Sequence, residues 1–202
     1  MKWTCEKLCI FKTKMDDSDY QKLHILIGKN FVRSGHMKNR TRIILRYLFV
    51  VLLGVFLHFA YELSGKNPIV GLFASVNESI WEHLKLLFFP FLILTLWDLF
   101  TTQKNSLCIL PARTLGILAG LLFIVVVFYT VTGILGFHAS WLNIFIYLLS
   151  VAFAFWVEKK LYEHCNPLSV KLAIAILILF IILFIVFTIS PPTLGIFIPP
   201  DA

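Results

Sequence analysis

The sequence predicts an all-α integral membrane protein built from five transmembrane helices. Of its 202 residues, 59% are hydrophobic and only 14% are charged. Five apolar runs approach the ~20 residues that a helix needs to cross a ~30 Å hydrocarbon core. A helix satisfies its own backbone hydrogen bonds, which allows such segments to lie in lipid. The runs cover residues 42–62, 80–100, 114–136, 141–158 and 170–190.

The basic residues predict how the chain is organised and oriented. Ten of the 18 Lys and Arg residues lie in residues 1–42, so we expect residues 1–41 to form a basic cytoplasmic tail. Residues 42–190 then form the transmembrane domain, and the proline-bearing segment 191–202 lies outside. Met37 begins a short basic lead into the first run and is an alternative start.

The same pattern predicts location and partners. A polar, basic N-terminus ahead of apolar runs indicates a multi-pass membrane protein with its N-terminus inside and the lipid bilayer as its partner. A net charge of +7 also occurs in nucleic-acid-binding proteins. Here the basic residues are concentrated in the tail and in short connections, so we expect no nucleic acid. Nothing in the sequence indicates an oligomeric state.

Several local signals mark the ends and contacts of the helices. Gly65 suits the left-handed position that follows the end of the first helix. Ser75 and Glu78 match the S-x-x-E capping box and predict the start of the second helix. Pro90 predicts a kink within that helix. Small residues four apart, at 116 and 120, predict a close helix contact in the third run.

Ionisable residues gather where the first run ends and the second begins. His58 and Glu62 are spaced i, i+4 and share one helix face. Glu78, Glu82 and Lys85 share a face of the second helix. The two helices run antiparallel through a short connection, so these groups lie at one depth near the outer interface. Charges at that depth are costly, which favours a compensated site over a random scatter.

A divalent metal is one way to compensate these charges. Mixed carboxylate and imidazole ligands suit zinc, iron or manganese. The candidate ligands are His58, Glu62, Glu82, His83 and His138. His83 points ~100° away from Glu82, while His138 lies in the outer connection after the third run. If the protein is an enzyme, we expect a metal-dependent membrane hydrolase for a lipid-like or envelope substrate, with Glu78 as the catalytic base.

Non-enzymatic interpretations remain open beside the metal. The cluster can be a structural polar network, with Asn77, Trp81 and Lys85 as structural or interface residues. Lys85 can neutralise one carboxylate or snorkel to the headgroups. Alternatively, one glutamate can hold a proton and act as a proton relay or a substrate-binding acid. The protein is then a lipid or small-molecule transporter, or an assembly subunit. At the inner interface, Asp98 and Glu158 are expected to be solvated.

One stretch resembles a known family. Phe56 to Phe91, "FLHFAYELSGKNPIVGLFASVNESIWEHLKLLFFPF", is similar to the core of an uncharacterised family of small polytopic bacterial membrane proteins, a domain of unknown function. The N-E-S-x-W-E-H-x-K string carries the resemblance, which extends from Lys38 to about Phe197. It implies a multi-span bacterial inner-membrane protein. The family has no assigned activity, so no catalytic residue carries over.

Overall fold

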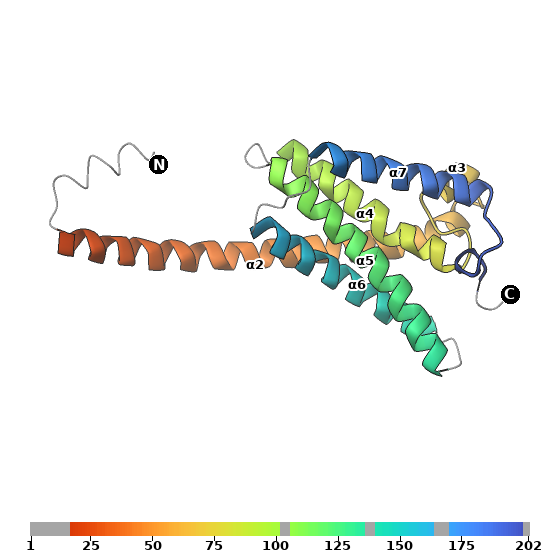
Figure 1. Ribbon diagram of the computed structural model, residues 1–202, viewed down its shortest axis with the longest axis horizontal. Coiled ribbons are helices and arrows are strands. Elements are labelled where there is room, and N and C mark those ends of the chain that lie inside the picture. Colours follow the sequence, from red (N-terminus) through yellow and green to blue (C-terminus); the bar gives the residue numbers. More distant parts are fainter. Residues whose placement is uncertain (1–16, 102–105, 136–139, 164–169, 200–202) are drawn as a thin grey trace. The chain divides into compact units, whose positions relative to one another are not determined.

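The computed structural model of the chain describes residues 17–101, 106–135, 140–163 and 170–199. Within these ranges, side chains are described from residue 40 on, apart from 106–108, 135, 140 and 163. The described residues are helical, with no strand (Figure 1). The elements are α2 (Asp17–Leu63), α3 (Pro68–Gly71), α4 (Ile80–Thr101), α5 (Ser106–Leu135), α6 (Ser140–Glu163), α7 (Val170–Ile189) and the short 3₁₀ helix η1 (Gly195–Phe197).

Five of these helices are long and apolar enough to cross a membrane, which confirms the predicted fold class. The candidate spans are Arg40–Leu63, Ile80–Thr101, Ile109–Ile134, Trp141–Tyr162 and Val170–Ile189. Residues 1–45 and 46–202 form two separate units, and α2 runs through both. The helix bundle lies in the second unit.

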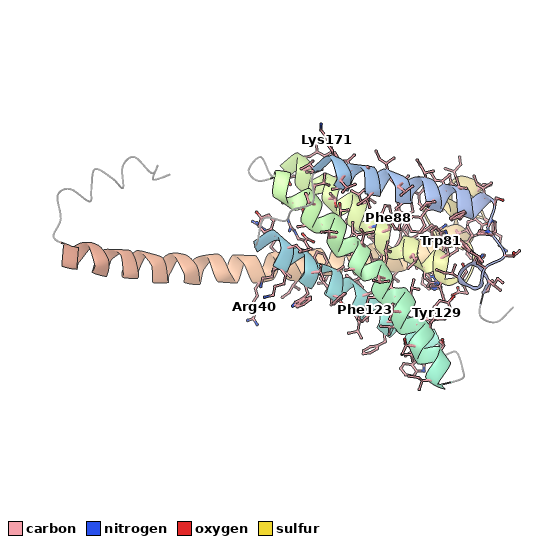
Figure 2. The ribbon with its side chains drawn as sticks, viewed as in Figure 1. Arg40, Trp81, Phe88, Phe123, Tyr129 and Lys171 are labelled. Carbon is pink, nitrogen blue, oxygen red and sulfur yellow. The ribbon has the colours of Figure 1, made fainter. Side chains whose placement is uncertain are left out.

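Helix α4 is the core of the bundle. Buried residues make up 61% of its span window, against 17–28% in the other four. The side chains of Phe88 and Trp81 extend from α4 toward α7 (Figure 2), where both rings pack against Phe184. The other four spans expose many large apolar side chains, such as Leu52 on α2 and Ile178 on α7. Outward-facing apolar side chains are what a lipid environment requires.

Helices α5 and α6 approach closely at the two predicted small residues. A Cβ at Gly116 would lie 2.7 Å from the carbonyl oxygen of Ala154. A Cβ at Gly120 would lie 3.0 Å from the Cβ of the same alanine. Only glycine allows this separation of the two backbones, so the predicted close contact is confirmed.

A buried charged quartet joins α2, α4, α5 and α6 at the end of the bundle away from the α2–α4 connection. Arg113 is fully buried and pairs with Asp98 at 2.9 Å and with Glu158 at 2.6 Å. Arg46 contacts the other oxygen of Asp98 at 2.6 Å. The expectation that Asp98 and Glu158 are solvated was therefore wrong. Two guanidinium groups on neighbouring helices neutralise them, which hydropathy along a single helix does not reveal.

The connection between α2 and α4 is held by its own backbone and side-chain hydrogen bonds. Gly65 adopts a positive φ of 68°, and the Lys66 amide donates to the carbonyl of Tyr61 at 3.0 Å. These features form a Schellman motif, which confirms the predicted helix end. Asn67 then caps α3 by accepting a hydrogen bond from the Ile69 amide.

The start of α4 differs from the prediction. The helix begins at Ile80, and the Ser79 hydroxyl accepts a hydrogen bond from the Glu82 amide at 3.4 Å. The predicted capping pair of Ser75 and Glu78 was wrong, because the Ser75 hydroxyl donates to the Asn77 carbonyl instead. The sequence repeats S-x-x-E four residues later, and the second copy marks the helix start. Glu78 consequently lies on the connection, with its carboxylate available for other contacts.

Candidate functional site

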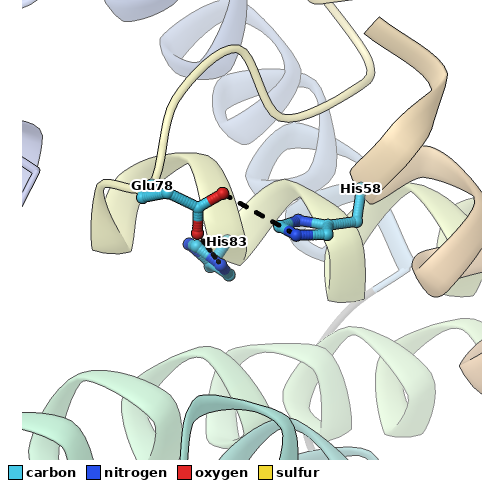
Figure 3. Close-up of side chains that lie close together, drawn as sticks. All are labelled: His58, Glu78 and His83. Atoms are coloured by element: carbon cyan, nitrogen blue, oxygen red, sulfur yellow. Dashed lines mark ion pairs between the residues drawn. The ribbon is translucent and has the colours of Figure 1, made fainter. Parts of the chain in front are cut away.

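Two histidines and one glutamate meet where α2 ends and α4 begins. His58 extends from α2 and His83 from α4, and the Glu78 carboxylate lies between the two imidazoles (Figure 3). One donor atom from each residue lies within 4.8 Å of the others. We call these three residues the His–Glu–His cluster. Its ring centroids are 5.4 Å apart, so both imidazoles reach one small volume.

The distances within the cluster are longer than those of direct ion pairs. Nε2 of His58 is 3.7 Å from Oε1 of Glu78, and Nε2 of His83 is 3.4 Å from Oε2. Charge-assisted hydrogen bonds between such groups are shorter, at about 2.7–2.9 Å. Donors bound at about 2.0–2.1 Å to a tetrahedral zinc ion lie about 3.3–3.4 Å from one another. Both distances are therefore longer than direct pairing, and they end on different oxygens of Glu78, while one donor atom of each residue lies within 4.8 Å of the other two.

Hydrogen bonding leaves Nε2 of His83 available as a ligand. Its Nδ1 lies 2.9 Å from the Ser79 carbonyl oxygen, which can only accept, so Nδ1 carries the proton. Nε2 then presents its lone pair toward Glu78. A backbone carbonyl that orients a ligating imidazole in this way is the usual outer shell of a metal-bound histidine.

His58 differs from His83 in its second ring nitrogen. Nδ1 of His58 is buried and has no hydrogen-bond partner among the described residues. A buried polar atom left unpaired costs about 1–3 kcal/mol. A histidine placed only to stabilise the fold gains little from this position. His58 therefore lacks the orienting partner that His83 has, and its ring is held by packing, with Phe59 4.9 Å away between ring centroids.

Glu82 and Lys85, both predicted near the site, lie in a separate buried network. Nζ of Lys85 contacts Oε2 of Glu82 at 2.6 Å, the Gly71 carbonyl at 2.9 Å and the Thr188 hydroxyl at 3.0 Å. Oε2 of Glu82 also accepts from the Val76 amide at 2.9 Å. We call Glu82, Lys85 and Thr188 the Glu–Lys network. It ties the connection that carries Glu78 to α4 and α7.

The other predicted site residues are distributed around the cluster. Glu62 is exposed and pairs with Lys66 at 3.8 Å, outside the cluster. The Asn77 side chain accepts a hydrogen bond from the Ser79 amide, a structural role at the start of α4. His138 lies outside the described residues.

Trp81 and Lys85 are both more buried than an interface position implies. Trp81 is 9% exposed and packs against Phe184, Phe187 and Phe197. Lys85 is fully buried and pairs with Glu82, so it neutralises a carboxylate and does not snorkel, as the other expectation had it. Trp81 is covered by the segment after α7, which returns over the start of α4 through η1 and Phe197. Periodicity within α4 could not indicate that cover.

A pocket of about 200 Å³ adjoins the His–Glu–His cluster between α2, α4 and α6. Sequence reasoning missed its floor, where Gly54, Leu86 and Tyr147 meet. Pro90 has no N–H, so the Leu86 carbonyl lacks its helical partner, and the Tyr147 hydroxyl approaches it at 3.4 Å. The hydroxyl also donates to the Val50 carbonyl at 3.1 Å. Pro90 within α4 was the one signal that an external donor was needed.

The comparisons with known proteins identify a family. A model described as a family of unknown function (DUF6512) matches residues 32–200. The chain belongs to this family. The match contains all three members of the His–Glu–His cluster and the pocket beside it. No curated protein and no solved structure matches the chain significantly.

Proposed function

We propose that this multi-pass membrane protein binds a divalent metal ion at the His–Glu–His cluster. The observation that carries the proposal is the placement of His58, Glu78 and His83, with imidazole-to-carboxylate distances of 3.4 and 3.7 Å. Two imidazoles and one carboxylate suit zinc best, with iron(II) and manganese(II) as the other candidates. Compared with the sequence-based hypothesis, Glu78 replaces Glu62 and Glu82 as the carboxylate.

The donor set points to a catalytic metal. Structural zinc sites are closed by four protein ligands, whereas catalytic sites keep a position for water or substrate. The described residues supply three ligands, and the adjoining pocket offers space for a fourth from outside the protein. A metal-activated water is a nucleophile at neutral pH. We therefore infer a metal-dependent membrane hydrolase.

A non-enzymatic role is the second candidate, and the Glu–Lys network favours it. Buried ionisable groups in that network pair with one another or with backbone, as a structural network requires. If the His–Glu–His cluster had the same purpose, the protein would be a transporter or an assembly subunit without a metal. The two candidates differ in metal content.

Elemental analysis by mass spectrometry tests the metal directly. The protein is purified in mild detergent without a polyhistidine tag, and His83→Ala and Glu62→Ala are purified in parallel. Glu62→Ala is the matched control, since it removes an acidic residue one helical turn from His58 without touching the cluster. We expect near-stoichiometric metal in the wild type and in Glu62→Ala.

The cluster variant should behave differently. Removing even an outer-shell partner of a metal ligand lowers affinity roughly 10–100-fold, so His83→Ala should lose its metal on dialysis. Wild-type protein without metal after dialysis against zinc, or equal metal in all three proteins, would contradict the proposal. The structural candidate would then stand.

We also infer the plasma membrane as the location, with the N-terminus in the cytoplasm. The concentration of basic residues in the N-terminal segment supports the orientation, and the location follows from the resemblance to bacterial inner-membrane proteins. In this orientation the His–Glu–His cluster faces the outside. Labelling of a cysteine introduced at exposed Ser64 by a membrane-impermeant maleimide on intact cells tests this orientation.

A further inference from the structure

The pocket beside the His–Glu–His cluster has a polar end and an apolar side. His58, Glu78, His83 and Asn143 line the polar end. Asn143 adds a side-chain amide to this lining, with two hydrogen-bond donors and one acceptor. A ligand of this pocket must therefore carry both a polar and an apolar part.

The floor keeps the pocket from closing. A Cβ on Gly54 would collide with the Tyr147 hydroxyl and lie 2.6 Å from the Leu86 carbonyl oxygen. Glycine at this position lets α2, α4 and α6 converge below the pocket. The two hydrogen bonds of Tyr147 to backbone carbonyls fix the convergence. The pocket is preformed by packing and does not depend on a ligand.

The apolar side of the pocket faces the surroundings of the bundle. Val55, Phe59 and Ile144 line it and are 43%, 55% and 60% exposed. All three lie within candidate spans. In a bilayer these side chains contact acyl chains, so the pocket opens sideways to lipid. A ligand can enter between α2 and α6 without leaving the membrane.

The depth of the pocket matches an amphipathic molecule. Counted from the end of α2, Phe59 lies four residues in, His58 five and Val55 eight, or ~6, ~7.5 and ~12 Å along the helix. The apolar side therefore begins at the depth of the polar end and continues ~4.5 Å further toward the hydrocarbon. The volume of about 200 Å³ is below the ~300–1,000 Å³ of sites that enclose a drug-sized molecule. The pocket holds part of a ligand whose remainder lies in lipid.

Charge selects the headgroup. Two neutral imidazoles, one carboxylate and a divalent cation sum to +1, and no other charged side chain lines the pocket among the described residues. An anionic group is therefore favoured at the open coordination position. A phosphate supplies the charge and hydrogen-bond acceptors for the Asn143 amide.

We propose that the pocket binds a phospholipid from the adjacent leaflet, with its phosphate at the metal of the His–Glu–His cluster and its first chain carbons along Val55, Phe59 and Ile144. This inference rests on the proposed function and names its substrate class. A larger apolar hollow of about 470 Å³, between the end of α2 and α3, has no charged lining. It provides an internal control for lipid contact without a headgroup site.

Photo-labelling in liposomes tests the proposal. The probe is phosphatidylglycerol with a diazirine near the ester end of one chain, in liposomes of phosphatidylethanolamine and phosphatidylglycerol. Labelled peptides are mapped by mass spectrometry with zinc-loaded and chelator-treated protein. We expect labelling around Ile144 that falls several-fold when zinc is removed, while labelling of the α3 hollow stays constant.

A pair of tryptophan variants separates the lipid from the metal. Ile144→Trp fills the opening, and Ile178→Trp makes the same change on α7, at a position 51% exposed and outside the pocket. Ile144→Trp should keep its zinc and lose the zinc-dependent labelling, whereas Ile178→Trp should keep both. The lipid proposal is overturned if the protein binds zinc but its labelling is unchanged by removal of zinc and by both substitutions. The metal site would then still stand. Wild-type protein that binds no zinc overturns both.

Discussion

The Glu–Lys network offers a prediction whose size follows from the structure. Lys85→Met removes a fully buried ammonium group that contacts Glu82 at 2.6 Å. Glu82 is 3% exposed, and among the described residues its carboxylate then keeps only the Val76 amide at 2.9 Å and the Thr188 hydroxyl at 3.4 Å. Removing one partner of a buried ion pair lowers stability by about 3–5 kcal/mol, because the remaining charge stays buried without compensation. Total stabilities are about 5–15 kcal/mol, so the loss is a large fraction.

Two control variants decide whether the pairing is responsible. Lys66→Met breaks the exposed pair of Lys66 and Glu62, both 67% exposed, and should change stability by about 0–1 kcal/mol. The double variant Glu82→Gln with Lys85→Met removes both buried charges. It should be more stable than Lys85→Met alone, since replacing a whole buried pair by uncharged residues is often close to neutral.

Unfolding in mixed micelles, followed by tryptophan fluorescence, measures all of these free energies. The reasoning would be refuted by a loss for Lys85→Met no larger than that for Lys66→Met. It would equally be refuted if the loss in free energy of unfolding of the double variant equalled the sum of the losses of Glu82→Gln and Lys85→Met. The two buried charges would then be uncoupled.

Three further predictions concern contacts between helices, and the same unfolding assay checks each. Asp98→Asn should cost about 1.5–3 kcal/mol because it weakens charged hydrogen bonds to Arg113, and an unchanged stability would contradict the quartet. Tyr147→Phe should lower stability by about 0.6–1.7 kcal/mol, the range for hydrogen bonds within membrane bundles. An unchanged stability would mean that the Leu86 carbonyl has another donor. Gly54→Ala should cost about 1–3 kcal/mol through overpacking. Combining it with Tyr147→Phe should recover part of that loss, since the hydroxyl is the obstacle.

The fold class was predictable because lipid imposes a simple rule on each helix. Length and apolar content are properties of a continuous segment, so five runs in the sequence became five spans in the structure. The Schellman end at Gly65 and the contact at Gly116 and Gly120 are also local signals. The start of α4 was misplaced because Ser75 and Ser79 offer the same capping pattern. Only tertiary contacts of the connection chose between them.

The depth of the candidate site in the membrane was predictable from the sequence, but only some of its residues were. Helix geometry placed His58 near the start of the second helix, but carboxylate partners depend on how the connection folds. Glu82 turned toward Lys85 and α7, while Glu78 left the helix and reached the two imidazoles. The cover provided by η1 and the hydrogen bonds of Tyr147 arise between distant segments. A single sequence carries no signal for such pairings.

X-ray absorption spectroscopy at the zinc edge tests the central claim most directly. The protein has four cysteines, at positions 5, 9, 108 and 165, which are alternative zinc ligands. Zinc at the His–Glu–His cluster predicts a first shell of nitrogen and oxygen at about 2.0–2.2 Å, with imidazole scattering and no sulfur. A sulfur shell at about 2.3 Å, or an imidazole signal that survives in the His58→Ala, His83→Ala double variant, would contradict a metal site at the cluster.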